Sequence, residues 1–124
     1  MSWLAVAAGA TLGAWLRWGL GLLLNATHAQ IALGTLIANL GGGFLIGMAV
    51  AFFTAHPGLS PAWRLFAVTG FLGGLTTFSS FSAESMALLQ RGDLAWALAH
   101  SGLHLAGALV CCFAGFALYR TLAG

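Results

Sequence analysis

The residues best suited to chemistry lie in one run, from Gly70 to Ser82, which reads Gly-Phe-Leu-Gly-Gly-Leu-Thr-Thr-Phe-Ser-Ser-Phe-Ser. Its glycines and threonines disfavour the interior of a helix and favour an unwound turn. Where a helix is unwound, free carbonyls suit a cation and free N–H groups suit an anion. The run therefore predicts a site at which main-chain atoms bind ions.

Aromatic rings and hydroxyls follow these glycines. Phe78 and Phe81 are three residues apart, so they share one face of a restarted helix. The positive edge of an aromatic ring is a mild contact for an anion, although ordinary packing explains the same spacing. The hydroxyls either line a wet path or bond back to their own helix. They belong to Thr77, Ser79, Ser80 and Ser82.

Other polar residues interrupt apolar segments, where each is costly unless it is paired or hydrated. Asn39 offers two N–H donors, either to an anion or to a neighbouring helix. Thr35 lies one turn before it on the same face. Glu84 is the only carboxylate inside an apolar segment, and we expect it to act in pore chemistry or to pair with an arginine.

His100 and His104 are four residues apart, a spacing that can bind a metal. No third ligand of the usual kind lies close in sequence, so we expect interhelical hydrogen bonds or water contacts instead. The adjacent Cys111 and Cys112 are interpreted as small buried hydrophobic residues. The chain has no group of nucleophile, base and orienting residue and no phosphate-binding loop, so no enzymatic activity is expected.

Composition sets the class of protein that must position these residues. Of the 124 residues, 60% are hydrophobic and 5% are charged, against about 25% charged residues in ordinary soluble domains. We therefore expect an all-α integral membrane protein. The net charge of +2, from four arginines and two acidic residues, is too small to favour nucleic-acid binding.

Four apolar segments predict four transmembrane helices in a single membrane domain, residues 1–124. A straight helix over the third segment would be about 40 Å long, whereas the hydrocarbon core of a bilayer is about 30 Å thick. We therefore expect this helix to be broken near residues 73–77. Gly9 and Gly13 are four apart, as are Gly43 and Gly47, which allows neighbouring helices to approach closely. The expected spans are residues 3–24, 31–54, 62–90 and 94–119.

The arginines give no preferred orientation in the membrane. With four spans, Arg64 and Arg120 lie on one side, and Arg17 and Arg91 lie toward the other. Because the excess of Arg and Lys sets topology, this balance predicts insertion in both orientations. Two copies then pair antiparallel, as the inverted repeats of transporters do within one chain.

The run from Gly73 to Ser82, with Glu84 behind it, resembles the CrcB/Fluc fluoride channels. The resemblance extends to Gly13–Arg17 and to Gly34–Asn39, and to the four spans. It implies an antiparallel, dual-topology homodimer in a lipid bilayer, usually the bacterial inner (plasma) membrane. It also implies two pores that export fluoride passively and a structural sodium ion at the dimer centre.

The resemblance also implies roles for individual residues. The backbone carbonyls of Gly73 and Thr76 from both copies would hold the sodium ion. His100, His104 and Ala108 stand where the family often carries hydroxyls on the fourth helix. The candidates for the fluoride pathway are Arg17, Thr35, Asn39, Thr77, Phe78, Ser79, Ser80, Phe81, Glu84 and His104.

Two other functions remain open on the sequence. Small four-helix proton-coupled exporters also pair antiparallel, but they use a carboxylate in the middle of the first helix, and this chain has none there. The chain could also be a non-transporting assembly subunit of a larger membrane complex. Transport that depends on a proton gradient would favour the proton-coupled exporter. An absence of ion flux would favour the assembly subunit.

Overall fold

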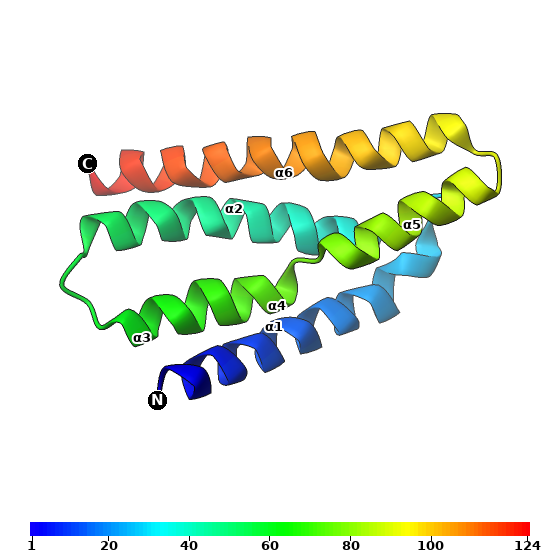
Figure 1. Ribbon diagram of the computed structural model, residues 1–124. Coiled ribbons are helices and arrows are strands. Elements are labelled where there is room, and N and C mark those ends of the chain that lie inside the picture. The colour runs from blue at the N-terminus through cyan, green and yellow to red at the C-terminus, as the bar shows by residue number, and fades with distance from the viewer.

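The computed structural model describes all residues, 1–124, and is helical throughout with no strands. Four segments are long and apolar enough to cross a membrane, as predicted: Ser2–Thr27, Leu33–Ala55, Pro61–Gln90 and Leu94–Ala123. Because an even number of crossings returns the chain to its starting side, the N- and C-termini lie at the same end of the bundle (Figure 1).

The four segments differ in how many helical elements they contain, and the third contains the most. The first segment consists of α1 (Ser2–Leu24) and the short 3-10 turn η1 (Asn25–Thr27), and the second segment is α2 (Leu33–Ala55). The third contains α3 (Pro61–Arg64), the π-helical η2 (Leu65–Leu72), α4 (Gly73–Leu75) and α5 (Phe78–Gln90). The fourth is α6 (Leu94–Ala123), which extends beyond its predicted end at residue 119.

Glycines let α1 lie directly against η2 and α4. A Cβ built on Gly9 would overlap the Phe66 carbonyl, and one on Gly13 would lie 2.7 Å from the Leu75 nitrogen. A Cβ on Gly70 would lie 3.0 Å from Gly9 Cα. The predicted close approach at Gly9 and Gly13 is confirmed. It is possible only because both helices carry glycine, which has no side chain, where they touch.

The second close contact joins α2 and α6, which run side by side (Figure 1). A Cβ on Gly43 would lie 2.9 Å from the Ala108 carbonyl, and one on Gly47 would overlap the Cys112 carbonyl. The predicted approach at these two glycines is confirmed as well. The bundle is thus two tightly packed helix pairs, α1 with η2 and α4, and α2 with α6.

The glycines of the third segment do not unwind, contrary to the sequence prediction. Gly73 and Gly74 are helical, and only Thr76 (ψ 155°) and Thr77 (ψ 121°) have extended backbone. A Cβ on Gly74 would lie 3.0 Å from Ala10 Cα, so Gly74 also serves the contact with α1. Helical backbone stops at Leu75 and resumes at Phe78.

After Thr77, the chain crosses from α1 toward α6. The short helix α4 contacts α1, whereas α5 packs on α6 (Figure 1). Gly92 then takes a φ of 80°, which turns the chain between α5 and α6; the predicted glycine stop after Gln90 is confirmed. The Thr76–Thr77 segment is therefore the point at which the third span changes its packing partner.

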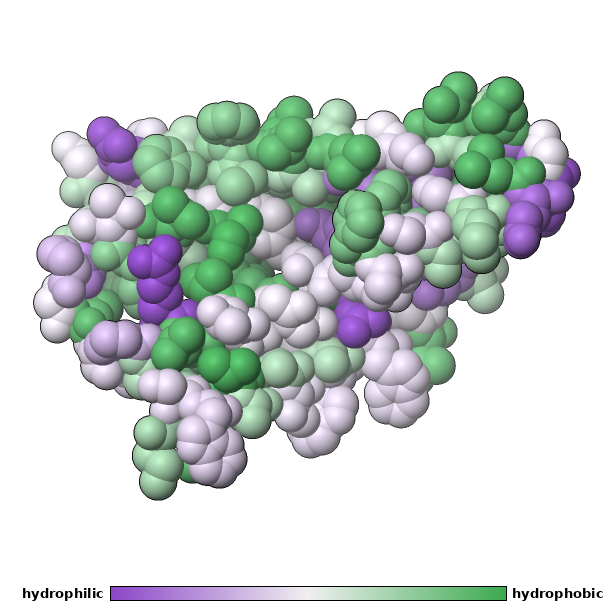
Figure 2. All heavy atoms as spheres, in the orientation of Figure 1, coloured by the Kyte–Doolittle hydropathy of each residue, from purple (hydrophilic) through white to green (hydrophobic).

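The outer surface is largely apolar. Only 20 of the 124 residues are buried, and large apolar side chains on all four spans are exposed. Figure 2 shows hydrophobic residues spread over the visible face, with hydrophilic residues at the turn between α5 and α6, at the opposite end and at a few places between. This pattern fits a multi-pass protein whose outside faces lipid or another chain.

Candidate functional site

The side chain of Asn39 on α2 binds the extended segment of the third span. The Thr77 N–H donates to Asn39 Oδ1 at 2.7 Å, and Asn39 Nδ2 donates to the Thr77 carbonyl at 3.0 Å. In a continuous α-helix the Thr77 N–H would instead donate to the Gly73 carbonyl. One half-buried amide therefore replaces main-chain bonds that the extended segment loses.

Two carbonyls of the third span lose their helical donors in this way. The Thr77 N–H is taken by Asn39 rather than by Gly73. The Ser80 N–H, which a continuous helix would direct to the Thr76 carbonyl, donates to Thr77 Oγ1 at 3.0 Å and so caps α5. The carbonyls of Gly73 and Thr76 are thus available as hard oxygen ligands, which suit a cation such as sodium.

Arg17 on α1 bonds to the carbonyl between these two positions. Its Nε donates to the Gly74 carbonyl at 3.1 Å. In a continuous helix that carbonyl would accept from the Phe78 N–H. Arg17 therefore supplies a third substitute contact around the Thr76–Thr77 segment.

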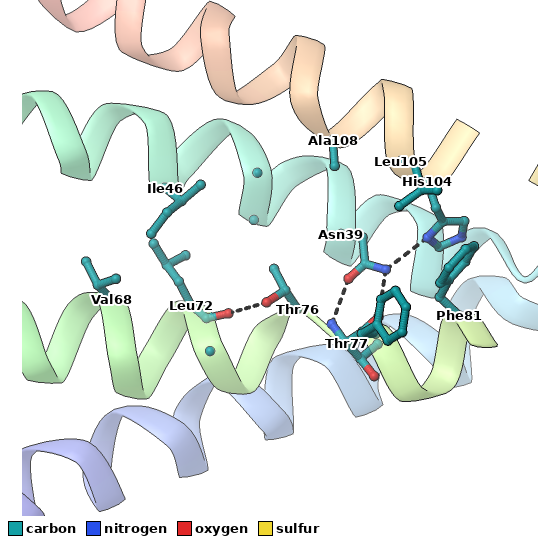
Figure 3. A pocket seen from close by; sticks show the side chains of 14 residues that line it. Asn39, Ile46, Val68, Leu72, Thr76, Thr77, Phe81, His104, Leu105 and Ala108 are labelled. Carbon is teal, nitrogen blue, oxygen red and sulfur yellow. Dashed lines mark hydrogen bonds between the residues drawn. The ribbon is translucent and has the colours of Figure 1, made fainter. Parts of the chain in front are cut away.

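A cavity of about 370 Å³ opens beside this segment. Figure 3 shows Asn39 inside it with its amide between Thr77 and His104, while Ile46, Val68 and Leu72 form an apolar wall. Asn39 Nδ2 also lies 2.9 Å from His104 Nδ1. The fourteen lining residues are Asn39, Gly42, Gly43, Ile46, Val68, Leu72, Gly73, Thr76, Thr77, Phe78, Phe81, His104, Leu105 and Ala108.

The two phenylalanines both line this cavity but differ in exposure. Their ring centroids are 5.5 Å apart, as expected for residues on one helix face. Phe81 is 7% exposed and Phe78 is 73% exposed. Phe81 packs on the rings of His100 and His104, at centroid distances of 5.3 and 4.9 Å. Packing thus accounts for Phe81 within this chain, whereas Phe78 presents its ring outward.

A second cavity, of about 360 Å³, brings together most of the remaining candidates. Glu84 accepts a hydrogen bond from Thr35 Oγ1 at 2.8 Å. The expected pair between Glu84 and an arginine is not formed, although Arg17 lines the same cavity. The lining residues are Arg17, Trp18, Gly21, Leu22, Asn25, Thr35, Ser80 and Glu84.

The hydroxyls divide between the two alternatives that the sequence left open. Ser80 lines the second cavity, and Thr77 lines the first. Ser82 bonds back to the Phe78 carbonyl at 2.8 Å, and Thr76 to the Leu72 carbonyl at 2.8 Å. Ser79 lines neither cavity, and its hydroxyl contacts only Thr77 Oγ1, at 3.3 Å. Of the predicted hydroxyls, the structure thus brings Thr35, Thr77 and Ser80 to a cavity, but not Ser79 or Ser82.

Sequence reasoning missed how Glu84 joins the two histidines. Glu84 Oε1 lies 3.1 Å from His100 Nε2, and ligand atoms of Glu84, His100 and His104 all lie within 4.8 Å of one another. The third ligand is not close in sequence because Glu84 lies on α5, across the turn from the histidines on α6. The feature of the sequence that could have indicated this contact is the short polar turn at residues 91–93, which folds α5 and α6 into a hairpin.

Comparison with known proteins adds a family match over most of the chain. Residues 4–116 match the family model described as CrcB-like protein, Camphor Resistance (CrcB). The fluoride-specific ion channel FluC of Pseudomonas putida (strain W619) is 54% identical over 123 residues, covering 99% of this chain and 97% of that protein. The protein of the same name from Cupriavidus pinatubonensis is 56% identical, with 99% and 98% covered. That of Nitrosomonas europaea is 55% identical over 114 residues, with 92% and 90% covered.

Proposed function

The chain belongs to the CrcB-like family, and on this basis we propose that it is a fluoride-selective channel that exports fluoride passively and lowers its cytoplasmic concentration. The relatives named above are ion channels, which are not enzymes. Their bacterial sources support a place in a bacterial inner membrane. The proposal assigns ion-binding residues and no catalytic ones.

The observation that carries the proposal is the half-buried amide of Asn39 at the wall of the first cavity. Fluoride is small and strongly hydrated, so a narrow path must replace its water with several donors. Asn39 Nδ2 has two N–H groups, one on the Thr77 carbonyl and the other facing His104 Nδ1. Asn39 and Thr77 exchange two hydrogen bonds, which hold this N–H in place. We therefore assign the other N–H, the one facing His104, as the donor to fluoride.

The path proposed from this point follows the residues around the two cavities. Arg17 attracts the anion at the second cavity, where the hydroxyls of Thr35 and Ser80 and the Glu84 carboxyl lie. Asn39 and the ring edges of Phe78 and Phe81 contact it at the first. Thr77 and His104, which line the first cavity, and Ser79, which lines neither cavity but contacts Thr77 Oγ1, complete the set of proposed pathway residues.

A structural sodium ion belongs to the same proposal. The Gly73 and Thr76 carbonyls, which have lost their helical donors, fit a hard cation that prefers oxygen ligands. Two carbonyls from each of two chains would surround the ion with four oxygens, on the axis that relates the copies. Its positive charge would favour anions nearby.

This arrangement requires an antiparallel homodimer. Phe78 projects from a single chain, and one chain supplies only half of the proposed sodium ligands. The even split of the arginines, with Arg64 and Arg120 opposite Arg17 and Arg91, supports insertion in both orientations. A second copy would cover the outward ring and complete the ion site.

Fluoride efflux from proteoliposomes tests the function directly. We expect fluoride to leave the vesicles much faster than chloride, at a rate that does not change when a pH gradient is imposed. Efflux that requires a proton gradient would support the exporter instead. Purified dimer that carries no ion flux would support the assembly subunit.

Removal of sodium tests the central ion. Replacing sodium by a large organic cation during purification and reconstitution should lower fluoride efflux, because four carbonyl oxygens would face one another without a cation. Returning sodium should restore it. Full efflux in its complete absence would rule out a required sodium ion.

A further inference from the structure

Three side chains on α5 and α6 bring ligand atoms close to one another, and none of the three is a ligand of the proposed sodium site. His100 is completely buried and His104 is 3% exposed, while the Glu84 side chain is 25% exposed. Their ligand atoms all lie within 4.8 Å of one another. Two imidazoles and one carboxylate form the ligand set of many transition-metal sites.

Each of these residues is held from its far side by a different neighbour. Thr35 Oγ1 donates to Glu84 Oε2 at 2.8 Å, and Ser85 Oγ lies 2.8 Å from His100 Nδ1. Asn39 Nδ2 lies 2.9 Å from His104 Nδ1. Metal ligands in proteins are oriented by outer hydrogen bonds of the kind that Glu84 and His100 make, whereas the contact between Asn39 and His104 holds the ring only while no metal is bound. The ligand atoms that remain without these outer partners are Glu84 Oε1, His100 Nε2 and His104 Nε2.

His104 Nε2 is a second and independent sign of a ligand. It is the one buried side-chain nitrogen or oxygen in the structure without a hydrogen-bond partner. A buried polar atom in that state costs free energy, and a bound ion would remove the cost. The 3.1 Å between Glu84 Oε1 and His100 Nε2 is close to the spacing of about 3.3 Å between adjacent tetrahedral ligands on bonds of about 2.0 Å.

We propose that Glu84, His100 and His104 bind a borderline transition-metal dication, with Zn²⁺ as the probe, and that the bound metal inhibits fluoride passage. Glu84 lines the second cavity, which gives the ion a route to the site. The ligands are nitrogen and carboxylate oxygen, so this site differs in chemistry from the carbonyl site proposed for sodium. Only the inhibition rests on the proposed function.

Inhibition follows from the hydrogen bonds of His104. While Asn39 Nδ2 donates to His104 Nδ1, the neutral ring carries its proton on Nε2. A metal on Nε2 displaces that proton, and Nδ1 must then carry one. Two N–H groups would face each other, so the contact with Asn39 breaks. Metal binding therefore disturbs the amide assigned to fluoride and the Phe81 ring that packs on both histidines.

Direct binding of Zn²⁺ to the purified full-length dimer tests the site. We expect one Zn²⁺ per chain, and X-ray absorption with two imidazole nitrogens and carboxylate oxygen near about 2.0 Å. His100→Gln should weaken Zn²⁺ binding at least tenfold. The matched control is His56→Gln, because His56 lies on the exposed turn after α2. This variant should bind Zn²⁺ as tightly as the unsubstituted protein. Equal Zn²⁺ affinity in His100→Gln, or binding abolished by His56→Gln, overturns the site.

A second variant covers the case in which His100→Gln fails to fold. Glu84→Gln keeps the shape of the side chain and an acceptor for Thr35, but it removes the anionic ligand. We expect it to lose Zn²⁺ affinity as well. An unchanged affinity, with no carboxylate oxygen in the absorption spectrum of the unsubstituted protein, overturns the site.

Fluoride efflux with added Zn²⁺ tests the inhibition. Micromolar Zn²⁺ should slow efflux by the unsubstituted protein and by His56→Gln, and should have at least tenfold less potency on His100→Gln. Zn²⁺ that binds without slowing efflux overturns the inhibition and leaves the site. An absence of fluoride efflux before any Zn²⁺ is added defeats the proposed function, and the binding result is unaffected.

Discussion

The Asn39 side chain makes hydrogen bonds that main-chain groups would make in a continuous helix. Its amide accepts from the Thr77 N–H, donates to the Thr77 carbonyl and faces His104. The sequence marked Asn39 because an amide inside an apolar span is costly unless it is bonded. The structure shows the interhelical bonds, which were one of the two alternatives, and its contact with an anion stays a prediction.

Asn39→Asp should reduce fluoride efflux by about tenfold or more, since lost or reversed hydrogen bonds at a partly buried site cost about 1–3 kcal/mol and about 1.4 kcal/mol is a factor of ten. The new oxygen would face the Thr77 carbonyl, and its negative charge would repel fluoride. Efflux per folded dimer is the measurement, with the dimer quantified by size exclusion. Efflux equal to that of the unsubstituted protein would remove the amide from the anion pathway.

The histidines mark the limit of sequence reasoning at the scale of residues. The spacing of His100 and His104 was visible, but the atom that completes the group comes from Glu84 on another helix. Nothing in the sequence fixes the rotation of α5 against α6, which decides whether Glu84 faces the histidines or lipid. Phe81 posed the same problem, because spacing placed it on a face without identifying the rings that it packs against.

The helices themselves follow closely from the sequence. Long apolar segments predict four spans, and four-residue glycine spacing identifies the surfaces that touch. The position of the extended backbone was less predictable, since Gly73 and Gly74 remain helical and the chain opens at Thr76 and Thr77. The deciding contacts come from the side chains of Asn39 and Arg17, which lie on other helices.

Gly13→Ala should destabilise the protein, because a methyl group would overlap the Phe71 carbonyl and lie 2.7 Å from the Leu75 nitrogen. Overpacking of this kind costs about 1–3 kcal/mol. The midpoint of thermal unfolding in detergent should therefore fall. Gly19→Ala on the same helix is the matched control, because nothing lies within 4 Å of the added carbon. Equal midpoints for the two variants would show that α1 need not lie so close to η2 and α4.

At the scale of the whole molecule, the even distribution of arginines predicts little bias toward either orientation in a membrane. Arg91, in the turn between α5 and α6, forms an ion pair of 3.5 Å with Asp93. Its side chain is 54% exposed, so the pair contributes little to stability. Arg91 is nevertheless one of only two arginines on its side of the predicted topology, together with Arg17. Arg64 and Arg120 lie on the opposite side.

Arg91→Ala should shift the population toward copies with Arg64 and Arg120 in the cytoplasm, because the side with more arginine stays there. A cysteine added after Gly124, labelled in intact cells by an impermeant maleimide, reports the fraction of chains with an external C-terminus. About half should be labelled before the substitution, given the even split of arginines, and clearly fewer after it. Arg91→Lys is the control and should change nothing. Complete labelling, or none, in the unsubstituted protein would contradict dual topology.

Both chain ends emerge from the same end of the bundle (Figure 1). Joining two copies head to tail through a short soluble linker would therefore give each copy the same direction in the bilayer. A tandem gene fusion that keeps the proposed opposed pair needs a linker that itself crosses the membrane once more. The topology of a single chain thus dictates how a one-polypeptide version of the pair must be engineered.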